Sequence, residues 1–150
     1  MKIAIGSDHV AFVYKQIIIK MLEEENHIVE DMGIYEETPI KDYLTAEKVA
    51  LSVFKGENQR GILICGTGIG MSISANKIPG IRAALCHNLY TAEMSRLHNE
   101  SNILVMGSRV LDIDLAKSIV MKWLDTEFEG GRHIPRNESI MALDKKYRCS

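Results

Sequence analysis

The sequence predicts an α/β protein, a three-layer α/β/α Rossmann-like domain built on a five-stranded parallel sheet. Short apolar runs of strand length alternate along the chain with longer segments in which apolar residues recur at helical spacing. No linker, repeat or low-complexity segment divides residues 1–150, so one domain is expected. The expected strands cover residues 2–5, 27–31, 61–65, 82–86 and 103–106.

Helices are expected between these strands and at the end of the chain. Asp42 and Asp112 each precede such a segment and are expected N-caps, because a carboxylate accepts hydrogen bonds from the free amides of a first turn. Ser7 or Asp8 could cap the first helix in the same way. The expected helices cover residues 12–25, 43–54, 69–77, 91–99, 112–128 and about 135–146.

The composition narrows the function classes. Lys and Arg number 18 against 20 Asp and Glu, a net charge of −2, so neither a nucleic-acid nor a membrane partner is indicated. No apolar stretch reaches transmembrane length. The three cysteines, Cys65, Cys86 and Cys149, are odd in number and form no CxxC pair, which argues against disulfides and a zinc site. A cytoplasmic protein without a bound metal or cofactor is therefore expected, and Cys86 and Cys149 give no signal beyond packing and a chain end.

The most informative stretch follows the third expected strand, where Cys65 is followed by glycines at 66, 68 and 70. Glycines let the backbone approach a ligand closely, and the helix that follows offers free N–H groups at a positive dipole end. This loop should attract negative charge, and the same field favours a thiolate at Cys65. The alternative is a packing cysteine before an ordinary strand-to-helix turn.

Three better-known loops do not fit this stretch. A nucleotide P-loop requires a Lys after its last glycine, where Met71 follows Gly70. A dinucleotide fingerprint requires a glycine at the sixth position, which is again Met71. A cysteine-based phosphatase loop would place an Arg at that same residue.

Polar residues follow other expected strands as well. Asp8 and His9 come after the first strand, and Arg109 comes after the last. Ligands of open α/β sheets bind at the carboxyl ends of the strands, and right-handed crossovers bring these ends to one edge. Asp8, His9, Cys65, Thr67 and Arg109 are therefore expected to share a crevice.

Six separated motifs resemble those of the type B ribose-5-phosphate isomerase family, which includes the galactose-6-phosphate isomerase subunits. The resemblance spans nearly the whole chain. The motifs are Gly6-Ser7-Asp8-His9, Cys65-Gly66-Thr67-Gly68-Ile69-Gly70, Ala75-Asn76-Lys77, Arg96-Leu97-His98-Asn99, Gly107-Ser108-Arg109 and Glu129-Gly130-Gly131-Arg132-His133 with Arg136.

The resemblance implies interconversion of an aldose phosphate and a ketose phosphate through an enediolate, without metal or cofactor. It implies that Cys65 is the base that moves the proton, with Thr67 beside it, and that His98 assists ring opening. It also implies a homodimer or homotetramer with an active site shared between subunits. The implied substrate-binding residues are the amides of Gly66, Thr67, Gly68, Ile69 and Gly70 for the enediolate, Asp8, His9, Tyr43 and Asn99 for the sugar, and Arg109, Arg132 and Arg136 for the phosphate.

Several points stay open at this stage. The resemblance makes ribose 5-phosphate the expected substrate. Because Ala11 stands where the family has a glycine and Leu44 where it has a proline, tetrose, allose and galactose phosphates remain alternatives. Taken singly, Arg109, Arg132 and Arg136 could be solvated surface charges. His98 could be an interfacial histidine, and His133 only its neighbour.

Two rivals belong to other classes. The loop after Cys65 also resembles the phosphocysteine loop of sugar-transport IIB components, although those domains carry the cysteine after their first strand. The other rival is a sugar-phosphate-binding protein without catalysis, which would not need a reactive thiol.

Overall fold

The computed structural model describes residues 1–35 and 43–147. Its centre is a sheet in the order β2-β1-β3-β5-β4, in which every neighbouring pair is parallel. This confirms the predicted α/β class and the five-stranded parallel sheet. The strands are β1 (Lys2–Ser7), β2 (Ile28–Asp31), β3 (Arg60–Cys65), β4 (Ala83–Leu85) and β5 (Ile103–Gly107).

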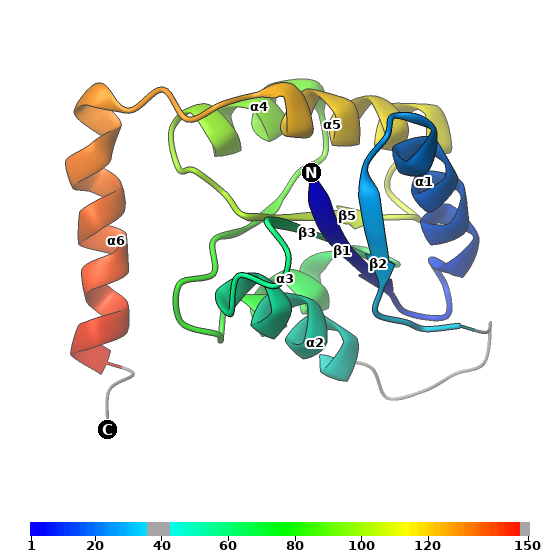
Figure 1. The fold of residues 1–150 in the computed structure, drawn as a ribbon, viewed down its shortest axis with the longest axis horizontal. Helices are drawn as coiled ribbons and strands as arrows, with labels where there is room; N and C mark the ends of the chain where they lie inside the picture. Colours follow the sequence, from blue (N-terminus) through cyan, green and yellow to red (C-terminus); the bar gives the residue numbers. More distant parts are fainter. Residues whose placement is uncertain (36–42, 148–150) are drawn as a thin grey trace.

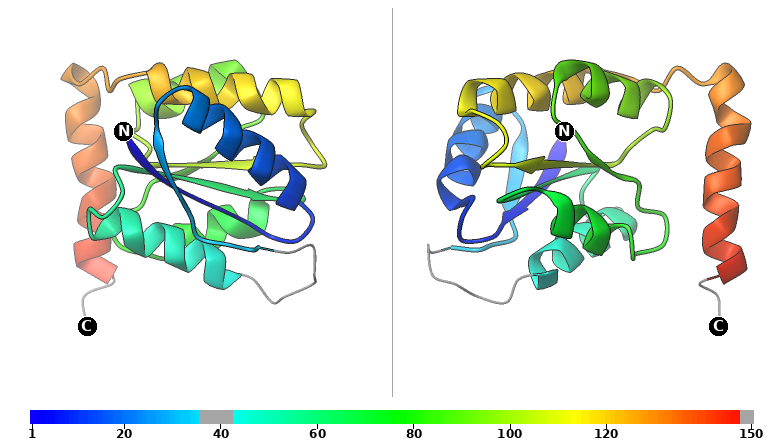
Figure 2. Two further views of the ribbon diagram at one scale, coloured as in Figure 1. Left: turned by 45° about the vertical axis from the view of Figure 1, so that its right-hand side comes forward. Right: turned by 180° about the vertical axis from the view of Figure 1, so that it is seen from behind.

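The helices form a layer on each face of the sheet. Figure 1 shows α1, α4 and α5 on one face and α2 and α3 on the other, which makes the three predicted layers. The last helix, α6, stands to one side of these layers in every view (Figure 2). The helices are α1 (Phe12–Glu24), α2 (Tyr43–Phe54), α3 (Ile69–Ala75), α4 (Leu89–Leu97), α5 (Ile113–Asp125), the 3-10 turn η1 (Gly131–His133) and α6 (Ile134–Tyr147).

Alternation along the strands divides the core in two. Ile62 and Ile64 of β3 pack in the cluster with α1 and α5, whereas Leu63 between them packs with α2 and α3. All three side chains are fully buried. Because helices cover both faces, successive residues must be apolar, which explains why the strands appear in the sequence as continuous apolar runs.

Most predicted boundaries hold within two residues, but α5 is shorter than predicted. It ends at Asp125 rather than near residue 128. Its last carbonyls accept from distant arginines, since Arg60 Nη1 donates to the carbonyls of Trp123 (3.2 Å) and Leu124 (2.9 Å). Arg96 Nε donates to the carbonyl of Thr126, at 3.2 Å. These tertiary partners satisfy the free carbonyls of a helix end, so the helix stops there.

Of the helix caps predicted from the sequence, the structure confirms Asp112. Asp112 caps α5, with its Oδ1 accepting from the amide of Leu115 at 2.9 Å. α4 begins two residues earlier than predicted because Asn88 Oδ1 accepts from the amide of Thr91 at 2.8 Å. Asp8 Oδ1 accepts from the amide of Ala11 at 3.0 Å, in the turn before α1 rather than as its N-cap. The predicted cap at Asp42 lies outside the described residues, as does Cys149.

No helix in the described parts of the chain combines the length and the apolar character needed to span a bilayer.

Candidate active site

A cavity of about 590 Å³ lies at the carboxyl ends of β1 and β3. It brings together the five residues expected to share a crevice, because β1, β3 and β5 are neighbours in the sheet. Tyr43 reaches it from the start of α2, and Val10 and Met71, which sequence reasoning did not single out, complete its wall. The lining residues are Asp8, His9, Val10, Tyr43, Cys65, Gly66, Thr67, Gly70, Met71 and Arg109.

Cys65 is the last residue of β3, and its half-buried side chain faces this cavity. The amide of Gly68 donates a hydrogen bond to its Sγ at 3.1 Å. An N–H directed at sulfur stabilises negative charge there, at the same loop-to-helix junction that the sequence indicates. The backbone is held from the other side, because the amide of Ser108 donates to the Cys65 carbonyl at 2.8 Å.

Two of the glycines after Cys65 lie where any larger residue would clash with a neighbouring side chain. Gly68 is the N-cap of α3 with φ of +81°, and a Cβ there would lie 2.4 Å from Leu85 Cδ1. A Cβ on Gly70 would lie 2.6 Å from Cε1 of Tyr43, so the aromatic ring rests directly on the loop. The Ile69 amide donates to Thr67 Oγ1 at 3.3 Å. Two of the five amides expected to hold an enediolate, those of Gly68 and Ile69, are therefore already engaged within the loop.

Arg109 places a positive charge beside this loop. Its amide donates to the Gly66 carbonyl at 2.9 Å, and its exposed side chain lies over Gly66, where a Cβ would be 3.5 Å from Arg109 Cδ. Gly107, at the end of β5, lets the Thr67 backbone pass close to the strand, because a Cβ there would lie 2.6 Å from the Thr67 carbonyl. The guanidinium can therefore hold a phosphate group at the edge of the cavity.

On the opposite wall, Asp8 and His9 follow β1. The Asp8 amide donates to the Ile64 carbonyl at 3.2 Å, which ties this turn to the strand that carries Cys65. The Nδ1 atom of His9 is buried and has no hydrogen-bond partner among the described residues. A buried polar atom without a partner is costly, so a ligand hydroxyl in the cavity would offset that cost.

The remaining predicted site residues do not line this cavity. His98 is the C-cap of α4, and Asn99 follows it. Arg132 lies in η1 and Arg136 in the first turn of α6, both exposed. Helices of this fold run back against the strands, so the end of α4 and the segment after α5 lie at the amino-terminal edge of the sheet. Within one chain, the structure therefore separates His98 from Cys65.

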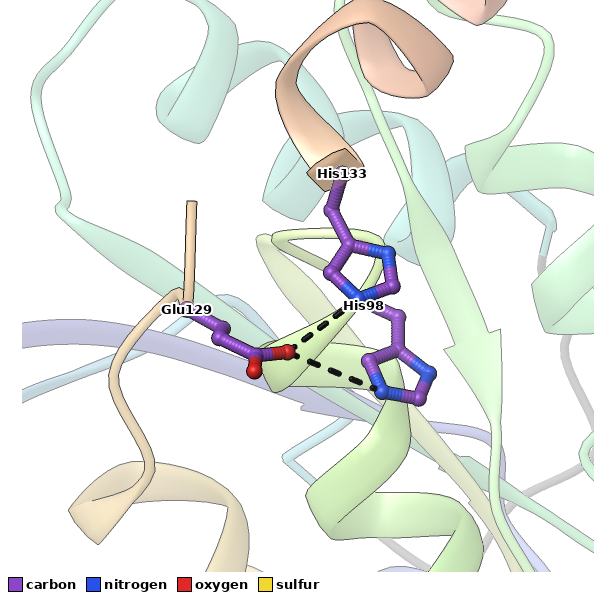
Figure 3. A group of neighbouring side chains, drawn as sticks. All are labelled: His98, Glu129 and His133. Carbon is purple, nitrogen blue, oxygen red and sulfur yellow. Dashed lines mark ion pairs between the residues drawn. The ribbon is translucent and has the colours of Figure 1, made fainter. Parts of the chain in front are cut away.

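At that edge, His98 belongs to a compact cluster (Figure 3). Its ring stacks on that of His133, with centroids 4.2 Å apart and planes 16° apart. Glu129 Oε2 lies 3.1 Å from His133 Nε2 and 4.0 Å from His98 Nε2. Burial and the neighbouring His98 lower the pKa of His133, which favours its neutral imidazole at neutral pH.

Two further contacts hold this cluster. Asn137 Nδ2 donates to the carbonyls of His98 (2.8 Å) and His133 (3.0 Å). Sequence reasoning assigned no part to Glu129 and treated His133 as a neighbour. Their spacing of four residues gave no usable signal, because Glu129 precedes η1 and the backbone at Gly130 and Gly131 between them has positive φ rather than helical geometry.

The family model for ribose/galactose isomerase matches residues 3–140. The chain is 49% identical over 147 residues to ribose-5-phosphate isomerase B of Escherichia coli, covering 97% of each chain. It is 44% identical over 143 residues to a D-erythrulose-4-phosphate isomerase of Pectobacterium atrosepticum, covering 93% of each. The structure of Clostridium thermocellum ribose-5-phosphate isomerase B superposes with a TM-score of 0.96 at 51% identity, covering 98% of this chain and 99% of that one. The chain belongs to the ribose/galactose isomerase family.

Proposed function

We propose that this protein is an aldose–ketose isomerase that converts ribose 5-phosphate to ribulose 5-phosphate. The assignment rests on the Cys65 thiol, which faces a cavity lined by Asp8 and Arg109. Its Sγ accepts a hydrogen bond from the Gly68 amide at 3.1 Å. A base, a phosphate-binding cation and polar groups for sugar hydroxyls thus surround one space. Its volume of about 590 Å³ suits a small ligand.

The chemistry follows from these positions. In the open-chain aldose, the Cys65 thiolate removes the proton from C2, the electron pair forms the C1–C2 double bond, and the C1 carbonyl oxygen takes up the charge. Backbone amides of the glycine loop stabilise this enediolate. The resulting thiol returns its proton to C1, while the C2 hydroxyl passes its proton to the C1 oxygen and becomes the carbonyl, so Cys65 ends as it began.

The site requires a second copy of the chain. His98, Asn99, Arg132 and Arg136 lie at the other edge of the sheet, so in a dimer they would reach the Cys65 cavity of the partner. Exposed apolar residues support such a dimer. On α6, Ile140, Leu143 and Tyr147 recur at helical spacing and are 42%, 54% and 71% exposed. We infer that α6 packs on the second copy, as a dimer or as a pair of dimers.

The substrate could be a sugar phosphate other than ribose 5-phosphate. A relative named D-erythrulose-4-phosphate isomerase supports a tetrose phosphate as a second candidate. The two residues that depart from the family pattern lie near the cavity: Ala11 is fully buried and donates to Asp8, whereas Leu44 is 62% exposed beside Tyr43. Allose or galactose 6-phosphate would require more room than the pentose at this end.

The test is turnover of metal-stripped protein on tetrose, ribose, allose and galactose phosphates, with aldose–ketose conversion followed by NMR. Ribose 5-phosphate should be converted fastest. Faster conversion of another sugar would reassign the substrate. Inactivity on all four with Cys65 reduced would reject the isomerase and favour the phosphocarrier or the sugar-phosphate-binding protein.

Because the proposed role of Cys65 requires a free thiol, we also place the protein in a reducing compartment such as the cytoplasm.

A further inference from the structure

We propose that His98, Glu129 and His133 form a binding site for a divalent transition-metal cation of the Zn²⁺ class, and that a cation bound there inhibits the enzyme by occupying His98. The inhibitory half rests on the proposed function, because it requires His98 to assist ring opening. The binding half rests only on the cluster. Neither follows from the cysteine pattern, which indicates no zinc site.

The donor atoms of the three side chains lie close enough together to converge on one cation. One ligand atom from each of the three side chains lies within 4.8 Å of the others. Tetrahedral zinc with bonds of about 2.0–2.1 Å to nitrogen and oxygen holds its ligand atoms roughly 3.4 Å apart. The 3.1 Å contact of Glu129 with His133 is close to this separation. His98 lies 4.0 Å from the carboxylate with its ring stacked on that of His133, so its imidazole must turn out of the stack for both nitrogens to reach one cation. Figure 3 shows both imidazoles directed at the same carboxylate oxygen.

One of the three ligands, His133, is held in place by the fold. The side chain of His133 is only 2% exposed, and its Nδ1 has no hydrogen-bond partner in the part of the chain that is described. Asn137 fixes the backbone at both histidines. Little conformational entropy is therefore lost when the His133 imidazole binds a cation, whereas the His98 side chain, 35% exposed, has room to turn toward it. Glu129, with an exposed side chain, supplies the adjustable third ligand.

The ligand types select the cation. Two imidazoles and one carboxylate suit zinc, copper or nickel, whereas magnesium and calcium prefer oxygen. Three protein ligands leave one position for water, as in zinc sites that exchange ligands. Arg132 opposes binding, because its Nε lies 3.4 Å from His133 Nε2. This exposed side chain must swing away, so replacing it should tighten binding.

Binding can be measured without reference to catalysis. Metal-stripped Cys65→Ser protein, which lacks the competing sulfur ligand in the cavity, is titrated with Zn²⁺ by calorimetry and with Co²⁺ by visible absorption. We expect one cation per subunit and a tetrahedral cobalt spectrum without a thiolate charge-transfer band. Glu129→Gln and His133→Gln should each weaken binding at least about 10-fold. Glu127→Gln, which removes an exposed carboxylate two residues away, is the matched control and should change nothing.

Inhibition is measured on the otherwise unmodified enzyme. Zn²⁺ should slow turnover, a chelator should restore it, and Glu129→Gln should shift the inhibitory concentration upward at least about 10-fold. Absence of binding, or binding that Glu129→Gln and His133→Gln leave intact, would overturn the site. Binding without inhibition would overturn the inhibitory half. A protein with no isomerase activity would refute the proposed function, while the titrations would still decide whether the site exists.

Discussion

The amide nitrogen of Gly68 and the Sγ atom of Cys65 lie 3.1 Å apart, so the N-cap residue of α3 also holds the proposed base. This hydrogen bond depends on a left-handed backbone at Gly68, φ +81°, which a residue with a Cβ adopts at a cost. Stability and catalysis are therefore coupled at one glycine.

Gly68→Ala should lower the free energy of unfolding by about 1–3 kcal/mol, from the backbone conformation together with the clash against Leu85 and the Met106 backbone. It should also reduce turnover by displacing the amide from Cys65. Gly56→Ala is the matched control, because φ is +73° there and no atom lies within 4 Å of the added Cβ. Urea denaturation and turnover check this, and equal effects of both substitutions on turnover would contradict the coupling.

Cys65→Ala should reduce kcat by about 10²–10⁴-fold or more, because it removes the proposed base. Binding of the substrate should persist, since Arg109 and the loop amides remain. Calorimetric titration with ribose 5-phosphate beside NMR turnover separates the two effects. A loss of binding as large as the loss of turnover would instead assign Cys65 to holding the substrate.

The separation of His98 from Cys65 predicts complementation between two inactive variants. Cys65→Ala and His98→Asn chains, coexpressed with different tags and purified as the mixed dimer, should regain about half of the wild-type activity, because one of two shared sites is then intact. Each variant alone should stay inactive. If one chain supplied the whole site, the mixed dimer would be as inactive as its parents.

Lys15 is fully buried on α1 and predicts a large stability effect. Its Nζ donates to both oxygens of Asp31, at 2.6 and 2.9 Å, and to the Ile34 carbonyl. Lys15→Met would leave the partly buried Asp31 carboxylate with only the Gly33 amide and would leave the buried Ile34 carbonyl unpaired, at a cost of about 3 kcal/mol in urea denaturation. Lys20→Met on the same helix removes only an exposed contact with Glu24 at 4.0 Å and should cost less than about 0.5 kcal/mol. Similar costs for the two would show that the buried pair contributes little.

The two described thiols should react at different rates. Cys86 is 1% exposed, and burial raises its pKa, whereas Cys65 faces the cavity. Iodoacetamide reacts with thiolates, so Cys65 should be alkylated well before Cys86 at neutral pH. The folded state holds the Cys86 proton more tightly than the unfolded chain. Raising the pH through the ordinary thiol range therefore destabilises the fold and favours Cys86 labelling through unfolding. Peptide mass spectrometry separates the sites, and early labelling of Cys86 would contradict its burial.

The sequence alone determined the layers, the parallel strands and the crevice of Asp8, Cys65 and Arg109. The signals for these are local: apolar periodicity marks each element, glycine spacing marks the loop, and parallel strands bring their carboxyl ends to one edge. The Asp112 cap could be predicted for the same reason, because a cap depends on residues three positions apart.

Only the tertiary structure decided where His98 and the residues around it lie. α5 ends early because Arg60 and Arg96, distant in sequence, satisfy its last carbonyls. His98 stacks on His133, and Glu129 faces both, because the segment after α5 returns past the end of α4. Such contacts depend on how elements far apart in the chain meet in space, and no local pattern encodes that meeting.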